Sequence, residues 1–287
     1  MTEVMKKFLL IGVISVIFLC IALATVLYAN KTRQEADSKI VPKSDEVKVE
    51  DSRNELIIAP MTELATEFSS SASASSSAQI TSIVSPEIFK LSMPYFEQEY
   101  EKSCEAASLR MVLEYYGIKS NDWDILQAIG YNPRGRDYTK NVWDDPAEMF
   151  VGYVEKGKIG YGAYAEPVAK AAKSFGRGAD VYKNVSPQIL AEHIMNGHPV
   201  IVWGYYLYST PVKYAWKTEA GKDIFGYRGE HTRVVYGFVG SVDSPEGFYV
   251  NDPNFVNGGA DQYWSTEKLM KNMNIMGEVS NQAVVVL

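Results

Sequence analysis

Hydrophobic and polar positions divide the 287-residue chain into three stretches of different character. Residues 8–28 are almost continuously apolar, whereas residues 31–87 are polar and include a long run of serine and alanine. Residues 88–287 mix apolar and polar positions as a globular domain does. The middle stretch cannot bury enough apolar surface to offset the entropy lost on ordering. We therefore expect a disordered linker over residues 31–87, followed by one folded domain.

Residues 1–30 are expected to form a short N-tail and a transmembrane anchor. A helix of 21 apolar residues rises about 31 Å, which matches the hydrocarbon thickness of a bilayer. Leu27-Tyr28-Ala29 is a poor signal-peptidase site, so we expect an uncleaved single-pass anchor; a cleaved signal peptide with secretion is the alternative. A short N-tail usually stays inside. The folded domain is therefore expected on the extracytoplasmic side of the cell membrane.

The periodicity within residues 88–287 predicts helices first and strands afterwards. A helix is predicted over residues 103–116, with Ser103 as N-cap and Gly117 as stop, because apolar positions recur there at helical spacing: Leu109, Val112, Leu113 and Tyr116. Further helices are predicted over 122–129, 145–151, 166–175, 186–196 and 265–273, and strands over 199–205, 231–239, 247–251 and 282–287. This order is typical of an α+β domain with a C-terminal antiparallel sheet. The glycine- and tyrosine-rich residues 157–164 are expected to form a groove wall without regular structure.

The charge balance argues against one class of partner. The formal net charge is −7, and a surface that follows nucleic-acid phosphates needs an excess of lysine and arginine. We expect no nucleic-acid partner.

Cys104 is the candidate nucleophile, because it is the one cysteine outside the apolar N-terminal stretch. It stands at the predicted start of a helix, where the macrodipole and the free backbone N–H groups favour a thiolate. The alternative is a small buried apolar residue without chemistry. A cysteine nucleophile also needs a base, and the base needs an orienting group.

His231 is the candidate base, because it begins a predicted strand, while His193 and His198 lie in and just after a predicted helix. If Val239 faces Ser244 across a four-residue loop, His231 stands opposite Asp252. Directly opposed residues share one face of the sheet, about 5 Å apart at Cβ, whereas a slip of one residue places them on opposite faces.

Gln98 is the candidate oxyanion-hole residue. Its side-chain amide precedes the helix that Cys104 begins, and together with the backbone N–H of Cys104 it could bind the oxygen of a tetrahedral intermediate. The alternative is an ordinary polar residue of a loop.

The sequence favours neither a metal nor another cofactor. A single cysteine without close Cys or His spacing does not make a zinc site. A calcium loop would draw on a set of oxygen-bearing side chains whose spacing is not that of an EF-hand; these are Asp252, Asn254, Asn257 and Asp261. We expect no metal and no cofactor.

Several ordered motifs carry a family resemblance over residues 91–287. They are Met93-Pro94-Tyr95-Phe96-Glu97-Gln98, Ser103-Cys104-Glu105-Ala106-Ala107, Trp143-Asp144-Asp145-Pro146, Gly160-Tyr161-Gly162, Gly197-His198-Pro199-Val200, Glu230-His231-Thr232-Arg233 and Asn251-Asp252-Pro253. With them the chain resembles the C39-like family of papain-fold cysteine peptidases, as a bacterial, membrane-anchored or secreted member.

The resemblance implies a papain-like fold with four site residues. Cys104 would be the nucleophile, His231 the general base and then acid, Asp252 the orienting group and Gln98 part of the oxyanion hole. Transporter-associated C39 peptidases, which cut leader peptides after paired glycines, have Asp-Cys-Gly where this chain has Ser103-Cys104-Glu105. The resemblance therefore extends to the fold and the triad and not to the leader-peptide substrate.

Three functional hypotheses follow. The first is an extracytoplasmic cysteine peptidase that acts on a peptide or protein substrate. The second is an acyl transferase or amidase on cell-wall peptides with the same triad. The third is a catalytically silent binding module on the protease-like fold, with its ligand in the groove near residues 160–162.

Overall fold

The computed structural model describes residues 87–206 and 211–287. The predicted anchor, and the predicted linker apart from residue 87, lie outside these residues, so both remain predictions. Within the two described ranges, no helix is both long and apolar enough to cross a membrane.

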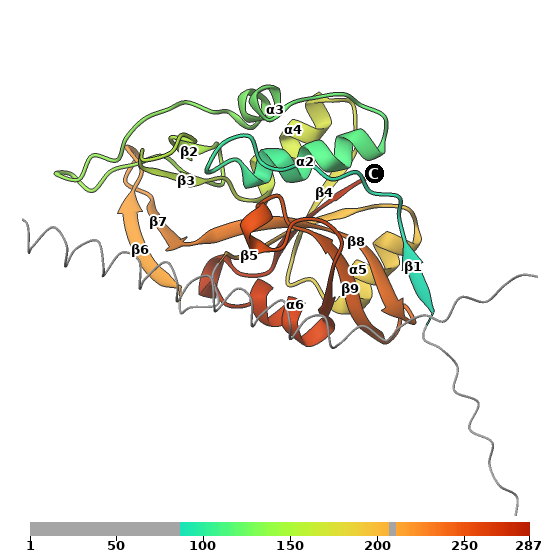
Figure 1. Cartoon of the computed structure of the whole chain (residues 1–287). Helices are drawn as coiled ribbons and strands as arrows, with labels where there is room; N and C mark the ends of the chain where they lie inside the picture. The colour runs from blue at the N-terminus through green and yellow to red at the C-terminus, as the bar shows by residue number, and fades with distance from the viewer. Residues whose placement is uncertain (1–86, 207–210) are drawn as a thin grey trace, which may run out of the picture. The chain divides into compact units, whose positions relative to one another are not determined.

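A seven-stranded antiparallel sheet organises the described part of the chain (Figure 1). The strand order is β10-β9-β8-β5-β11-β4, and β1 pairs with β8 beside β5. The strands are β1 (Ile88–Lys90), β4 (Ala179–Lys183), β5 (Val200–Tyr205), β8 (Glu230–Gly240), β9 (Pro245–Asn251), β10 (Gln262–Ser265) and β11 (Gln282–Val286). The long strand β8 is the centre of this arrangement, because it pairs with three others.

Helices cover both faces of the sheet (Figure 1). On one face lie α2 (Cys104–Tyr115), α3 (Asp122–Ile129) and α4 (Ala165–Ser174), and on the other lie α5 (Pro187–Met195) and α6 (Thr266–Met273). The strands divide their side chains between two cores accordingly. Ile201 and Trp203 pack with α2 to α4, whereas Val200 and Val202 pack with α5 and α6. The α+β fold class predicted from the order of helices and strands is confirmed.

The helix α2 begins at Cys104, as predicted, but Ser103 does not cap it with its side chain. The Ser103 hydroxyl donates to Asp122 Oδ2 at 2.7 Å and so ties the start of α2 to the start of α3. Leu109 and Leu113 are fully buried in the core beneath the helix. The position of Cys104 is thus set by packing and by this polar tie.

The predicted helix over residues 145–151 is wrong. Asp145 Oδ1 accepts from the backbone N–H of Ala147 at 2.9 Å and stabilises a turn. The chain then enters β2 (Val151–Gly152), which pairs with β3 (Gly160–Gly162). The expected groove wall at residues 157–164 therefore contains a short strand rather than irregular chain.

Some short elements have no counterpart in the sequence-based expectations. They are β4, β10, the two-stranded sheet of β6 (Val212–Lys217) and β7 (Asp223–Arg228), and the 3₁₀ turns η1 (Phe255–Asn257) and η2 (Gly277–Val279). Trp216 on β6 packs with Trp143 and Tyr161 in a third, smaller core. This core joins the β6–β7 hairpin to β3.

The predicted register of β8 and β9 is wrong by two residues. Val234 pairs with Asn251. If this register is continued by one residue, Arg233 lies opposite Asp252, and His231 does not. A bulge between Val235 and Gly237 shifts the pairing by one residue along the hairpin. The pairs beyond the bulge, such as Phe238 with Phe248, have a register that differs by one residue. If that register continued without the bulge, His231 and Asp252 would lie on opposite faces of the sheet. With it, they share a face as diagonal neighbours.

Candidate active site

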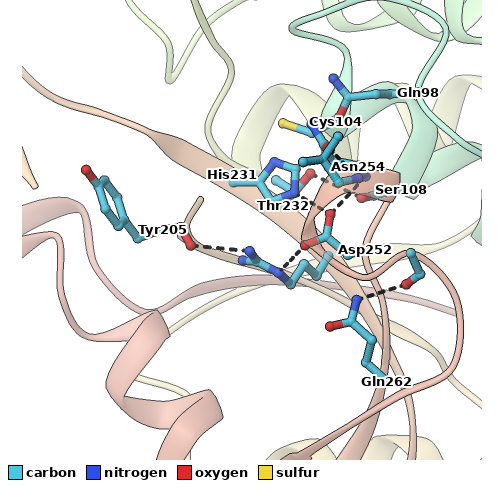
Figure 2. A network of polar contacts seen from close by, with 12 residues as sticks. Gln98, Cys104, Ser108, Tyr205, His231, Thr232, Asp252, Asn254 and Gln262 are labelled. Atoms are coloured by element: carbon cyan, nitrogen blue, oxygen red, sulfur yellow. Dashed lines mark hydrogen bonds and ion pairs between the residues drawn. The ribbon is translucent and has the colours of Figure 1, made fainter. Parts of the chain in front are cut away.

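Three elements bring the predicted residues together. Cys104 begins α2, His231 is the second residue of β8, and Asp252 directly follows β9. Their exposed fractions are 6%, 3% and 0%. Between them, Ser108 on α2 and Thr232 on β8 share a hydrogen bond of 3.1 Å, which fastens the helix to the strand. Figure 2 shows Cys104, His231 and Asp252 gathered in one network.

Cys104 and His231 line one cavity of about 390 Å³. Its other walls carry Gln98 from the entry loop, Gly160 and Tyr161 from β3, Tyr206, and Tyr214 and Tyr227 from the β6–β7 hairpin. The Tyr206 ring stands edge-on to the His231 imidazole, with centroids 5.5 Å apart. The cavity therefore presents a thiol and an imidazole within a largely aromatic wall.

Asp252 fixes the orientation of His231. The His231 Nε2 atom lies 2.7 Å from Asp252 Oδ1, so the other ring nitrogen, Nδ1, is left for the side of Cys104 (Figure 2). Asp252 is itself held by Arg233, whose Nε donates to Oδ2 at 2.7 Å, and by the backbone N–H of Asn254 at 2.8 Å to Oδ1. A buried carboxylate with these partners keeps its charge and its position.

The charge states of Asp252 and His231 depend on their burial and on the charges around them. Burial by itself would raise the pKa of Asp252, but His231, Arg233 and the Asn254 N–H together hold that pKa below its usual value. Burial lowers the pKa of His231, and although Asp252 opposes this, Arg233 adds to it. The arrangement is a neutral imidazole on an ionised aspartate, which is the protonation state of a general base.

Gln98 lines the cavity, but its amide is engaged elsewhere. Its Nε2 donates to the carbonyl oxygens of Tyr100 at 2.8 Å and Glu101 at 2.7 Å. The backbone N–H of Gln98 donates to the Pro253 carbonyl at 2.9 Å, which ties the entry loop to the segment after Asp252. In this arrangement the Gln98 amide supports the loop and is turned away from oxyanion binding.

The thiol differs from the sequence-based expectation. Cys104 Sγ donates to Glu105 Oε2 at 3.2 Å. Burial raises the pKa of the Cys104 thiol, the Glu105 and Glu230 charges raise it further, and the backbone N–H of Thr232 acts in the opposite direction. The expected thiolate at the helix N-terminus is therefore a neutral thiol, because burial and two carboxyl groups outweigh the helix dipole.

The two other histidines lie apart from this cavity, whereas Asn254, one of the residues considered for calcium, lines it. The His193 ring packs edge-on against Tyr182, 5.1 Å between centroids, and His198 stands near it at 6.3 Å. Of the residues considered for calcium, Asp252 binds His231 and Arg233, while Asp261 accepts from Tyr236 Oη at 2.7 Å.

Three residues of the site were missed by sequence reasoning. Arg233 lies two positions after His231, and this period-2 spacing on one strand face was the available signal. Glu105 directly follows Cys104 and Glu230 directly precedes His231, but adjacency in sequence does not reveal that both carboxyl groups are buried. Their burial depends on β3, whose position the sequence did not disclose.

Comparisons with known proteins agree with this fold. The model of the Peptidase_C39 like family matches residues 90–281, and the chain belongs to this family. A protein assigned as a C39-like peptidase from Bacillus anthracis is 25% identical, with a TM-score of 0.58 over 70% of this chain and 98% of its own. No curated protein matches the sequence.

Two more distant solved structures are peptidase domains of transporters. The peptidase domain of Streptococcus ComA, a bifunctional ABC transporter of a quorum-sensing pathway, is 17% identical, with a TM-score of 0.39 over 69% of this chain and 97% of its own. A double-glycine-motif protease from an AMS/PCAT transporter, solved with its leader peptide, is 18% identical, with a TM-score of 0.39 over 69% and 93%.

Replacing Arg233 tests its role as the second partner of Asp252. We expect Arg233→Met to lower the free energy of unfolding by about 3–5 kcal/mol near neutral pH, because it leaves a buried carboxylate with one partner fewer. Asp252 has a lowered folded-state pKa, so its contribution is present above its unfolded pKa and is lost as pH falls through the folded value. Urea unfolding should therefore show a smaller loss at acidic pH.

The matched control for this prediction is Lys119→Met. Lys119 pairs with Glu114 on the surface, with its side chain 83% exposed, and such pairs stabilise little. An equal loss in both variants, or a loss in Arg233→Met that is the same at neutral and acidic pH, would contradict the account of Asp252.

Proposed function

We propose that this chain is a cysteine peptidase that hydrolyses a peptide or amide bond through an acyl-enzyme at Cys104. The observation that carries the proposal is the cavity lined by both Cys104 and His231, with His231 held by the buried Asp252. Membership of the C39-like peptidase family supports the same reaction class.

The charge states favour general-base catalysis over a preformed ion pair. His231 starts neutral and takes the thiol proton on Nδ1 while Sγ forms a bond to the substrate carbonyl carbon. Asp252 stabilises the resulting imidazolium without taking its proton. The carbonyl oxygen gains the negative charge in the same step.

The oxyanion is bound at the start of α2. The first backbone N–H groups of a helix have no intrahelical partner, so the N–H of Cys104 is a suitable donor. Gln98 contributes a second donor once its amide rotates away from the Tyr100 and Glu101 carbonyls. This rotation would couple substrate binding to the loop that Gln98 supports.

Collapse of the tetrahedral intermediate breaks the C–N bond, and the His231 imidazolium gives its proton to the leaving amine. Water then gives a proton to His231 as its oxygen attacks the thioester. The second collapse releases the carboxylic acid and returns the proton to the Cys104 sulfur. All protons are accounted for by His231 and water, so no cofactor is needed.

We further propose that the reaction takes place outside the cytoplasm. The support is the sequence alone, in which the apolar residues 8–28 precede the domain. A linker of about 57 residues would have an end-to-end distance of roughly 40–45 Å. It would let a tethered peptidase reach substrates in a layer next to the membrane.

A catalytically silent binding module is the second candidate function. The observation in its favour is the Cys104 thiol, which is turned toward Glu105 and has a raised pKa. A module of this kind would bind a peptide in the same cavity and leave it intact.

Thiol labelling separates these two functions. We expect iodoacetamide to label Cys104 in the wild type and nothing in Cys104→Ala, and we expect His231→Ala to slow labelling about tenfold or more near neutral pH, because the base is lost. The rate is measured by intact mass. His193→Ala is the control, since this histidine lies against Tyr182 and away from the cavity. Equal rates in wild type and His231→Ala would contradict an activated nucleophile.

A search for new protein termini identifies substrates. Treating a bacterial surface extract with wild type should generate termini that Cys104→Ala does not generate, because cleavage requires the acyl-enzyme. Product mass distinguishes hydrolysis, which adds water to the two pieces, from acyl transfer, which joins the acyl piece to another amine. Identical termini from both proteins would contradict the proposed peptidase.

A further inference from the structure

Two glutamates with buried carboxyl groups flank Cys104 and His231. Glu105 directly follows Cys104 on α2, and Glu230 directly precedes His231 on β8. Glu105 has no exposed surface. Its Oε2 accepts from Cys104 Sγ at 3.2 Å, and its Oε1 accepts from the Ala163 backbone N–H at 2.6 Å. A carboxyl group is thus in direct contact with the reacting sulfur.

The Glu230 carboxyl group approaches the Glu105 carboxyl group from β8. Both of its oxygens are buried, and neither has a hydrogen-bond partner among the described residues. A Cβ added to Gly162 would lie 2.3 Å from Glu105 Oε1 and 3.0 Å from Glu230 Oε2. The two carboxyl groups therefore converge on one point of β3, where only a glycine leaves room for them.

No cation is bound to the Glu230 carboxyl group among the described residues. Titratable groups near the pair are Cys104, His231, Arg233, Tyr161, Tyr164 and Tyr214, and Lys102 and Arg228 line the same cavity as Glu230. Arg233 lowers the pKa of Glu230, but its Nε is bound to Asp252, and Lys102 Nζ is bound to Glu101 at 3.1 Å. Two carboxylates that converge on one buried point without a bound cation do not both ionise.

The protonation equilibria agree with the geometry. Burial raises the pKa of Glu105 to about 7. Burial also raises the pKa of Glu230 well above its usual value, the Glu105 charge raises it further, and Arg233 opposes both. Near neutral pH the pair therefore retains a proton.

We propose that Glu105 and Glu230 share one proton, and that the position of this proton switches Cys104 between a blocked and a reactive state. When the proton is on Glu230, the Glu105 carboxylate accepts the thiol hydrogen and holds it away from His231. When the proton is on Glu105, its O–H donates to Sγ, and the thiol hydrogen is free to turn to His231. The transfer breaks the O–H bond on Glu230 and forms one on Glu105, and the charge of the pair stays the same.

The switch rests on the proposed function, because it acts on Cys104 as the nucleophile of the peptidase. Glu105 touches the reacting sulfur and is a further catalytic residue. Glu230 acts through Glu105 and is a positioning residue. The test uses alkylation, which needs no peptide substrate, so its outcome is independent of whether cleavage is found.

The experiment measures the rate of iodoacetamide labelling of Cys104 against pH in wild type and two isosteric variants. Glu105→Gln mimics the protonated state, because its amide N–H donates to sulfur, so labelling near neutral pH should be about tenfold faster or more. Glu230→Gln removes the shared proton and lets Glu105 ionise freely, so labelling should be slower than in wild type. Wild type should show two ionisation steps, and Glu105→Gln should show one, because one coupled carboxyl is gone.

Opposite effects of the two substitutions are the signature of proton sharing. Glu192→Gln on the exposed side of α5 is the matched control and should follow wild type. Acceleration in both variants would mean two independent negative charges and would overturn the proposal, as would unchanged rates in both. Thermal melting confirms that each variant is folded, and if Glu105→Gln does not fold, the direction of the Glu230→Gln effect decides.

Discussion

The buried carboxylate of Asp252 is the group on which the site depends. It has no exposed surface, so its charge must be compensated within the protein. His231 and Arg233 supply that compensation at 2.7 Å each. Because one oxygen binds each partner, the bond to His231 also orients the imidazole and leaves Nδ1 toward Cys104. The same two contacts thus compensate the charge of Asp252 and orient the His231 ring.

This arrangement requires particular strand geometry. His231 lies on β8, and Asp252 directly follows β9. They share a face of the sheet only because a bulge near Tyr236 shifts the pairing of β8 and β9 by one residue. Arg233 then lies beside His231 on the same face and reaches the second oxygen of Asp252. The α2 helix completes the site from the other side, where the Ser108–Thr232 hydrogen bond joins it to β8.

Two opposing influences act on the pKa of the Cys104 thiol. The helix N-terminus and the Thr232 N–H favour a thiolate, whereas burial and the flanking glutamates favour a thiol. In this arrangement the thiol and the imidazole are both neutral, and the thiol donates to Glu105 Oε2. The site then depends on proton movement at the moment of reaction rather than on a standing ion pair.

Sequence reasoning brought the candidate residues together but did not give their exact relation. The helix at Cys104 and the strand at His231 have strong periodic patterns, and the three candidates meet as predicted, with the motifs of the family supporting them. The register was wrong, because a bulge has no clear local signal. The glutamate pair was missed, because a carboxyl group looks the same in sequence whether it is solvated or enclosed by β3.

The predicted turn of helix at residues 145–151 failed for a related reason. Asp145 and Pro146 are typical of a helix start, but the Asp145 side chain stabilises a turn, and the chain that follows pairs with β3. Local propensity gave way to a contact with residues far along the chain. The same contact sets the wall of the cavity, so the least predictable part of the fold is the part that encloses the nucleophile.

The mass of a covalent intermediate shows directly whether Cys104 is the nucleophile. Wild-type protein is mixed with a peptide that it cleaves, quenched in acid and digested with trypsin, which releases residues 103–110 as one fragment. We expect this fragment to carry the acyl half of the peptide as a thioester on Cys104. Cleavage of the same peptide by Cys104→Ala, or an acyl group on any other residue, would contradict it.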